Sequence, residues 1–205
     1  MSRCVVVAFA PAVWAAAWAA RPELEPYVEL LKRLAQGAPD WPEVSRYRTL
    51  LDADVDFVVP AGRLPAGLDD SDVDDSYIGR CVFGAVPTRT GSLHDLMNAL
   101  TWAACPRAKL SLCRRQVAVA RARGRHTNRL RTRAQDRLAM IDEGGMLALP
   151  DDHSRVFGHG LLEDLVLGRR SRGFSLVVES DADDVVGAAI TALALPPDDV
   201  SPDAR

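Results

Sequence analysis

Residues 92–123 carry the pattern that most constrains the fold, because they predict two successive helices with a sharp break between them. Ser92 is a preferred N-cap residue, and apolar residues recur after it at helical spacing. Pro106 cannot continue that helix but is well suited to begin another, which Gly124 then ends. The sequence therefore predicts helices over 92–104 and 106–123.

The face of the 92–104 helix opposite its apolar stripe has an unusual composition. An ordinary solvated face carries Lys, Glu, Gln or Arg. Because an α-helix turns about 100° per residue, this face instead brings together an imidazole, a carboxylate, a carboxamide and an indole. These belong to His94, Asp95, Asn98 and Trp102. Such groups can bind a metal, position a substrate or form an internal polar network, and the sequence leaves these alternatives open.

Three further side chains complete a candidate site. Asp142 and Glu143 are adjacent, and His159 stands between two glycines, where backbone can approach closely. Together with His94 and Asp95 they would form a general acid–base site or a site for a divalent metal, provided that the fold brings them together. The structural alternatives are a solvent-exposed turn for the two carboxylates and a helix start for His159.

Basic residues are unevenly distributed. The net charge is -3, yet residues 107–137 contain eleven of the 25 Lys and Arg and only one of the 28 Asp and Glu. A stretch of this kind is compatible with nucleic-acid phosphates, with a small anionic ligand, or with internal pairing to the acidic loop over 61–76. The stretch lacks aromatic residues on which bases stack, which counts against single-stranded nucleic acid.

Helical and strand-like segments alternate irregularly, which favours an α+β fold: a mainly helical single domain with a few short strands in a small, mostly antiparallel sheet or hairpins. The domain is expected over 1–195, followed by a loose tail over 196–205. Further helices are predicted over 12–36 (broken near residues 21–22), 43–51, 157–167 and 183–195, and strands over 55–59, 77–86 and 174–178.

Residues 142–145 predict the turn of a hairpin between strands at 138–141 and 146–149. The alternative is a helix that runs through Asp142 and ends at Gly144.

Cysteine usage and the N-terminal segment favour a cytoplasmic protein. Cys4, Cys81, Cys105 and Cys113 are widely spaced and form no metal-binding motif, so we expect free thiols. The apolar N-terminal run is interrupted by proline and tryptophan and continues as an amphipathic pattern, which favours a folded core over a signal peptide. No segment reaches the roughly 20 apolar residues of a membrane span, so no membrane contact is expected.

Several motifs resemble a known family. The first block comprises Val86-Pro87-Thr88-Arg89, the stretch from His94 to Trp102, and Pro106-Arg107-Ala108-Lys109; the segments 136–145 and 157–163 follow in the same order. In these blocks the chain is similar to the bacterial domain-of-unknown-function family 3025. The resemblance implies a bacterial cytoplasmic protein and carries no established activity. The chain departs from the family pattern at Cys105, at Ile141 and in the short connection 150–156.

The favoured hypothesis is an enzyme that binds a small anionic ligand, hydrolase-like, with a polar pocket on the 92–104 helix and a divalent metal as the candidate cofactor. The expected catalytic residues are His94, Asp95, Asp142, Glu143 and His159, and the expected ligand-binding residues are Arg89, Asn98, Trp102, Arg107 and Lys109. The alternatives are a nucleic-acid-binding or regulatory module that uses residues 107–137, and a protein-interaction domain.

Overall fold

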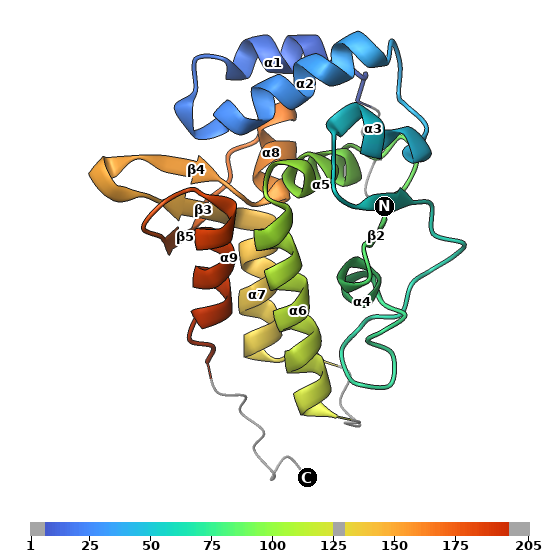
Figure 1. Cartoon of the computed structure of the whole chain (residues 1–205), viewed down its shortest axis with the longest axis vertical. Coiled ribbons are helices and arrows are strands. Elements are labelled where there is room, and N and C mark those ends of the chain that lie inside the picture. Colours follow the sequence, from blue (N-terminus) through green and yellow to red (C-terminus); the bar gives the residue numbers. More distant parts are fainter. Residues whose placement is uncertain (1–6, 125–129, 197–205) are drawn as a thin grey trace.

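Helix α5 (Leu93–Ala104) lies in the middle of the computed structural model, which describes residues 7–124 and 130–196 (Figure 1). Helices α1 (Pro11–Trp18) and α2 (Glu25–Gly37) pack against each other on one side of it. Helices α6 (Pro106–Arg123), α7 (Arg133–Gly144) and α9 (Asp183–Ala192) lie on the other side. The short helix α8 (His159–Val166) packs against both α5 and α7.

The helices around α5 form where the sequence predicts them. Ser92 accepts a hydrogen bond from the Asp95 backbone N–H, Pro106 opens α6, and Gly124 ends α6 with φ of +65°. The 12–36 region is broken as expected, with a 3-10 turn at Pro22–Leu24, and residues 43–51 form a 3-10 turn at Val44–Arg46 followed by α3 (Tyr47–Leu51). The prediction of a mainly helical α+β fold is confirmed.

Two apolar cores meet along this arrangement. The larger core joins α1, α2, α3, α5 and α8, and includes Trp14, Trp18 and Trp102. The second joins α6, α7 and α9 to strand residues such as Leu147 and Leu176. From residue 7 on, the apolar N-terminal segment is thus part of a folded core, and none of the helices described here combines the length and apolarity of a membrane span.

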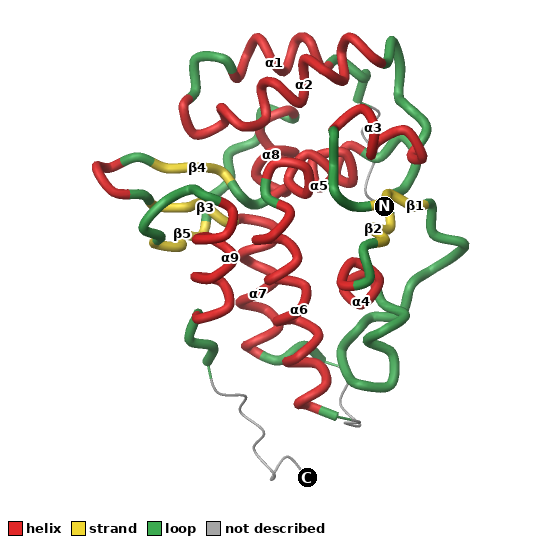
Figure 2. The backbone as a smooth tube through the Cα atoms, viewed as in Figure 1, coloured by secondary structure: helices red, strands yellow, loops and turns green. Residues whose placement is uncertain are grey.

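The strands form two separate small sheets (Figure 2). Strand β1 (Asp56–Val58) pairs in parallel with β2 (Ala85–Pro87), with Phe57 opposite Val86. Strand β3 (Gly145–Ala148) pairs antiparallel with β4 (Ser154–Val156) and parallel with β5 (Phe174–Val177). The expectation of mostly antiparallel pairing is therefore wrong, because helices α4 and α8 return the chain to begin β2 and β5 in the parallel direction.

The strand predicted over 77–86 is also wrong. Residues Tyr77–Val82 form helix α4, and only the end of the segment is the strand β2. Ser76 caps the helix by accepting a hydrogen bond from the Gly79 backbone N–H, and Gly84, with φ of +82°, turns the chain toward β2. A short apolar run does not distinguish a strand from a buried helix, and here the cap decides.

The hairpin predicted around residues 142–145 does not form, and the alternative helix ending at Gly144 is correct. A reciprocal capping box between Thr132 and Gln135 starts α7, which places Leu138 and Ile141 on its buried face. The helix passes directly into β3, which pairs with β4 and β5 instead of with residues 138–141. This correction moves Asp142 and Glu143 from an exposed turn to the last turn of a packed helix.

Gly79 allows the capping turn to approach α4 closely, and its replacement tests this contact. A Cβ atom at position 79 would lie 2.1 Å from the Val73 carbonyl oxygen. Because this clash is with backbone, we expect Gly79→Ala to lower the free energy of unfolding by about 1–3 kcal/mol, despite the better helix propensity of alanine. Urea denaturation measures the change. Gly62→Ala is the control, since its Cβ would meet nothing within 4 Å; an equal effect of both variants would contradict the packing.

Candidate metal centre

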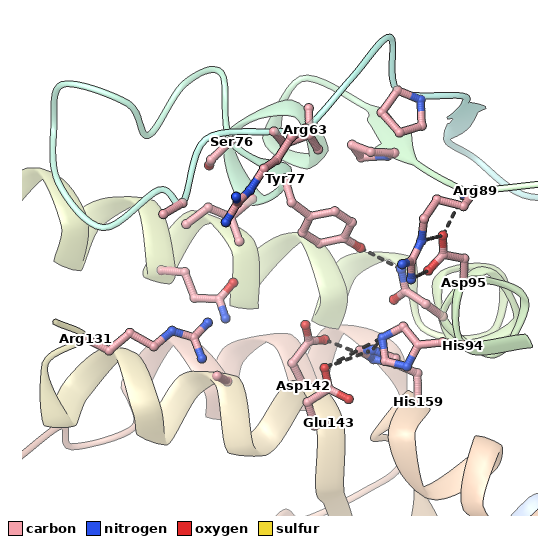
Figure 3. A pocket seen from close by; sticks show the side chains of 18 of the residues that line it. Arg63, Ser76, Tyr77, Arg89, His94, Asp95, Arg131, Asp142, Glu143 and His159 are labelled. Atoms are coloured by element: carbon pink, nitrogen blue, oxygen red, sulfur yellow. Dashed lines mark hydrogen bonds and ion pairs between the residues drawn. The ribbon is translucent and has the colours of Figure 1, made fainter. Parts of the chain in front are cut away.

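A cavity of about 540 Å³ opens beside α5 (Figure 3). Its wall combines the loop over 60–66 with side chains from α4, α5, α6, α7 and the start of α8. Seven of the residues predicted from sequence line it: Arg89, His94, Asp95, Asn98, Asp142, Glu143 and His159. Side chains that are far apart in the sequence thus share one concave region.

Three side chains meet at one end of this cavity: His94 from α5, Glu143 from the last turn of α7, and His159 from the first turn of α8. The two imidazole Nε2 atoms are 3.1 Å apart. Glu143 Oε1 lies 3.8 Å from His94 Nε2 and 3.4 Å from His159 Nε2. One donor atom from each residue therefore points toward a common centre, which makes this trio a candidate metal site.

The spacing of the three atoms fits a metal ion. Donor atoms bound to one ion at about 2.0–2.2 Å lie about 3.0–3.5 Å apart when they occupy adjacent positions of its coordination shell. The observed separations of 3.1, 3.4 and 3.8 Å need only small side-chain adjustments to match. Glu143 is 54% exposed, so the centre is open toward the cavity on the carboxylate side.

Each histidine turns its other nitrogen toward a carboxylate. His94 Nδ1 lies within hydrogen-bond distance of Glu163 Oε2, at 2.8 Å, whereas His159 Nδ1 lies 3.7 Å from Asp142 Oδ1 and has no hydrogen-bond partner among the described residues. A carboxylate only accepts hydrogen bonds, so the His94 proton resides on Nδ1 and the Nε2 lone pair faces the centre. Carboxylates that orient the distal nitrogen of a metal-bound histidine are a regular feature of metal sites.

Neighbouring carboxylates favour the protonated form of His159. Burial lowers the pKa of His159, but Asp142 and Glu143 outweigh burial and raise it to about 9. The Nε2 atoms of His159 and His94, 3.1 Å apart, are within hydrogen-bond distance of each other. A metal cation bound there would replace a proton of His159 with a larger positive charge.

A buried ion pair supports Asp142 from behind. Lys109 of α6 is almost fully buried, and its Nζ contacts Asp142 Oδ1. Burial raises the pKa of Asp142, but Lys109 and His159 outweigh it and hold the pKa well below its ordinary value. Asp142 is consequently a fixed carboxylate that faces His159, and Lys109 lies behind the cavity wall.

Asp95, on the same helix turn as His94, forms an ion pair with Arg89, and both of its carboxylate oxygens accept hydrogen bonds. It accepts hydrogen bonds from the Arg89 backbone N–H at 2.6 Å and from the guanidinium at 2.8 and 2.9 Å. Burial raises the pKa of Asp95, but these contacts outweigh it and keep the pKa below its ordinary value. The pair joins the loop after β2 to the start of α5.

The remaining polar groups of α5 are buried. Asn98 Nδ2 donates to the Tyr77 hydroxyl at 2.6 Å, and Asn98 Oδ1 has no hydrogen-bond partner. Trp102 is fully buried in the larger core, with Lys109 Nζ 5.8 Å from its ring centroid, and it does not line the cavity. The unusual face thus divides into a cavity wall at His94, Asp95 and Asn98 and a core position at Trp102.

Much of the basic stretch serves internal contacts. Arg107 lies outside the cavity, where its backbone N–H binds Asp183 at the start of α9. Arg115 binds the carbonyl groups at the end of α9, among them that of Ile190 at 3.1 Å. Arg121 pairs with Asp70 and Asp74 of the acidic loop. Of these contacts, that of Arg121 matches the predicted pairing with the acidic loop, whereas those of Arg107 and Arg115 join α6 to α9. Arg125, His126 and Arg129 lie outside the described residues, as do Cys4 and the tail from residue 197.

Sequence analysis missed several residues of this region. Glu163 lies four residues after His159, a helical spacing that could have suggested a shared face. Tyr77 was hidden by the incorrect strand prediction, and Arg63, Gln116 and Arg131 gave no signal because they belong to three separate segments. Among the described cysteines, Cys81, Cys105 and Cys113 are free thiols, as expected.

A family comparison agrees with the motifs. The family model described as "Protein of unknown function (DUF3025)" matches residues 69–155. The resemblance to DUF3025 is confirmed. The DUF3025 segment runs from the acidic loop to β4 and contains His94, Asp142 and Glu143, while His159 lies just beyond it. No curated protein matches the sequence.

Solved structures with a similar fold include phenylalanine hydroxylase from Chromobacterium violaceum. Two of its single-residue variants are 17% identical to this chain, each with a TM-score of 0.53; the alignments cover 90% and 89% of this chain and 78% and 79% of theirs. The same enzyme bound to cobalt is 16% identical with a TM-score of 0.51, covering 90% of this chain and 79% of the other. At this identity, the likeness shows a shared fold and nothing about activity.

Removal of Lys109 tests the buried ion pair. Lys109→Met leaves Asp142 as an uncompensated buried charge, so we expect the free energy of unfolding to fall by about 3–5 kcal/mol. Adding Asp142→Asn to this variant removes the unpaired charge, and the double variant should recover part of the loss. Urea denaturation of the two single variants and the double variant gives the coupling energy. Additive effects would contradict a direct ion pair.

Proposed function

We propose that this protein is an enzyme that depends on a single divalent metal ion held by His94, Glu143 and His159. The observation that carries the proposal is the convergence of two Nε2 atoms and one carboxylate oxygen, 3.1–3.8 Å apart, at the wall of a cavity. The His94 imidazole has a hydrogen-bonded carboxylate on its far nitrogen, and a second carboxylate, that of Asp142, lies 3.7 Å from the far nitrogen of His159, so the arrangement resembles a built metal site more than a chance cluster of surface charges.

The ligand set favours iron(II) and an oxidation. Two histidines and one carboxylate on one face of the ion, with the other positions open, are typical of non-haem Fe(II) oxygenases. The fold likeness to phenylalanine hydroxylase, a hydroxylating enzyme that has been solved with bound cobalt, supports a metal-dependent oxidation. Iron bound here would supply the capacity to activate O₂ next to a substrate in the cavity.

The chain's own residues would then have distinct roles. Glu163 orients His94 through a hydrogen bond, Asp142 lies beside His159 as a nearby negative charge, and the Lys109 ion pair keeps Asp142 charged and in place. Arg89 and Asp95 fix the start of α5, which carries His94. In this proposal, His94, Glu143 and His159 act as metal ligands and not as general acids or bases.

A zinc hydrolase is the second candidate, because two histidines and a glutamate also hold catalytic zinc. This candidate corresponds to the hydrolase-like reaction expected from the sequence. It shares the ligand residues with the iron proposal and differs in the metal and in the use of O₂.

Metal binding tests the proposed centre. We expect the metal-free protein to bind one equivalent of Co²⁺, with visible absorption bands from the bound ion, and His94→Ala, Glu143→Ala and His159→Ala each to weaken binding at least 100-fold. His153→Ala is the control, because this histidine lies outside the cavity and should leave affinity unchanged. Binding that survives loss of either His94 or His159 would contradict the proposal.

Metal identity separates the two candidates. Protein purified without chelators and loaded anaerobically with Fe²⁺ should consume O₂ in the presence of a turnover substrate, whereas the zinc-loaded form should not. Activity of the zinc-loaded protein that does not depend on O₂ would contradict the proposed oxidation. It would not contradict the proposed metal site.

A further inference from the structure

The cavity contains more positive charge than the metal centre needs. Arg63, from the loop between β1 and α4, and Arg131, from the segment before α7, both line it. Figure 3 shows their side chains on the side of the cavity away from His94 and His159, and both residues are exposed to solvent. Two cations from separate segments thus face the same part of the cavity.

Neither arginine is neutralised by the part of the chain that the structure describes. Arg63 and Arg131 make no ion pair or side-chain hydrogen bond within residues 7–124 and 130–196. The other charged groups of the cavity are paired: Arg89 binds Asp95, Asp142 binds Lys109, and Glu143 faces the histidines. Two unpaired guanidinium groups in one cavity favour an anion between them, since each offers a planar fork of donors.

A buried amide marks the same region. Gln116 of α6 lines the cavity and also, together with Arg131, a small adjoining pocket. The residue is only 6% exposed, and its Oε1 atom has no hydrogen-bond partner. A buried acceptor without a partner costs free energy that a ligand with an O–H or N–H group would recover. Asn98 Oδ1 is a second such acceptor in the cavity wall.

We propose that Arg63 and Arg131 bind the anionic group, a carboxylate or a phosphate, of a small organic substrate whose reacting part lies at the His94–Glu143–His159 centre. The position of the reacting part rests on the proposed function; the anion site rests only on the arginines and Gln116. A volume of about 540 Å³ suits a small molecule that extends from the arginine side to the metal side. The substrate class is therefore a small organic acid or phosphate ester with a hydrogen-bond donor.

Anion binding is tested on metal-free protein, so that no metal can bind the probe. We expect saturable one-to-one binding of sodium benzoate or of inorganic phosphate, followed by NMR at constant ionic strength, and the probe that binds identifies the anionic group. Arg63→Gln and Arg131→Gln should each weaken binding about 10-fold or more, the value of a charged hydrogen bond. Arg170→Gln, an exposed arginine outside the cavity, is the matched control.

Failure of this inference is distinguishable from failure of the metal proposal. Arg63→Gln and Arg131→Gln should bind Co²⁺ as the parent protein does, and His94→Ala should retain anion affinity while losing Co²⁺. Absence of saturable anion binding, or equal weakening by Arg170→Gln, overturns the anion site whatever the Co²⁺ titrations give. Loss of Co²⁺ binding in the arginine variants would contradict the separation of the two sites.

Discussion

The buried ion pair between Lys109 and Asp142 is the interaction on which the candidate centre depends. A lysine with 1% of its side chain exposed is costly to bury unless a carboxylate meets it, and Asp142 does so from the neighbouring helix. The pair joins α6 to α7 and fixes the last turn of α7, where Glu143 follows directly. Asp142 also faces His159, so one buried pair determines the position of two of the three candidate ligands.

The centre lies where the two apolar cores of the molecule meet. His94 belongs to a helix of the larger core, Glu143 to a helix of the second, and α8 packs between them. Close backbone contact makes this junction tight: a Cβ atom on Gly158 would lie 2.5 Å from the Glu143 carbonyl oxygen. A site between two rigid cores holds its side chains more firmly than a site on a loop, which suits the spacing that a metal requires.

The residues of the candidate site could be predicted from the sequence better than the helices and strands around them. His94 and its neighbours were detectable because an imidazole and a carboxamide on one helix face are not explained by exposure to solvent. The convergence of α5, α7 and α8 could not be predicted, since it depends on packing between segments 49 and 65 residues away from His94. The errors at 77–86 and 138–149 arose in short apolar runs, where caps and tertiary contacts decide between helix and strand. Lys109 illustrates the same limit: its partner lies on another helix, and only the fold shows that the residue is buried.

The most direct test of this account is a crystal structure of the Co²⁺-loaded protein with anomalous scattering measured at the cobalt edge. We expect one peak about 2.0–2.2 Å from the Nε2 atoms of His94 and His159 and from a Glu143 carboxylate oxygen. We also expect that Glu163 and Asp142 remain on the opposite nitrogens. A cobalt peak at other residues would contradict the proposed metal centre. So would crystals that hold no cobalt and in which the two imidazoles have moved apart.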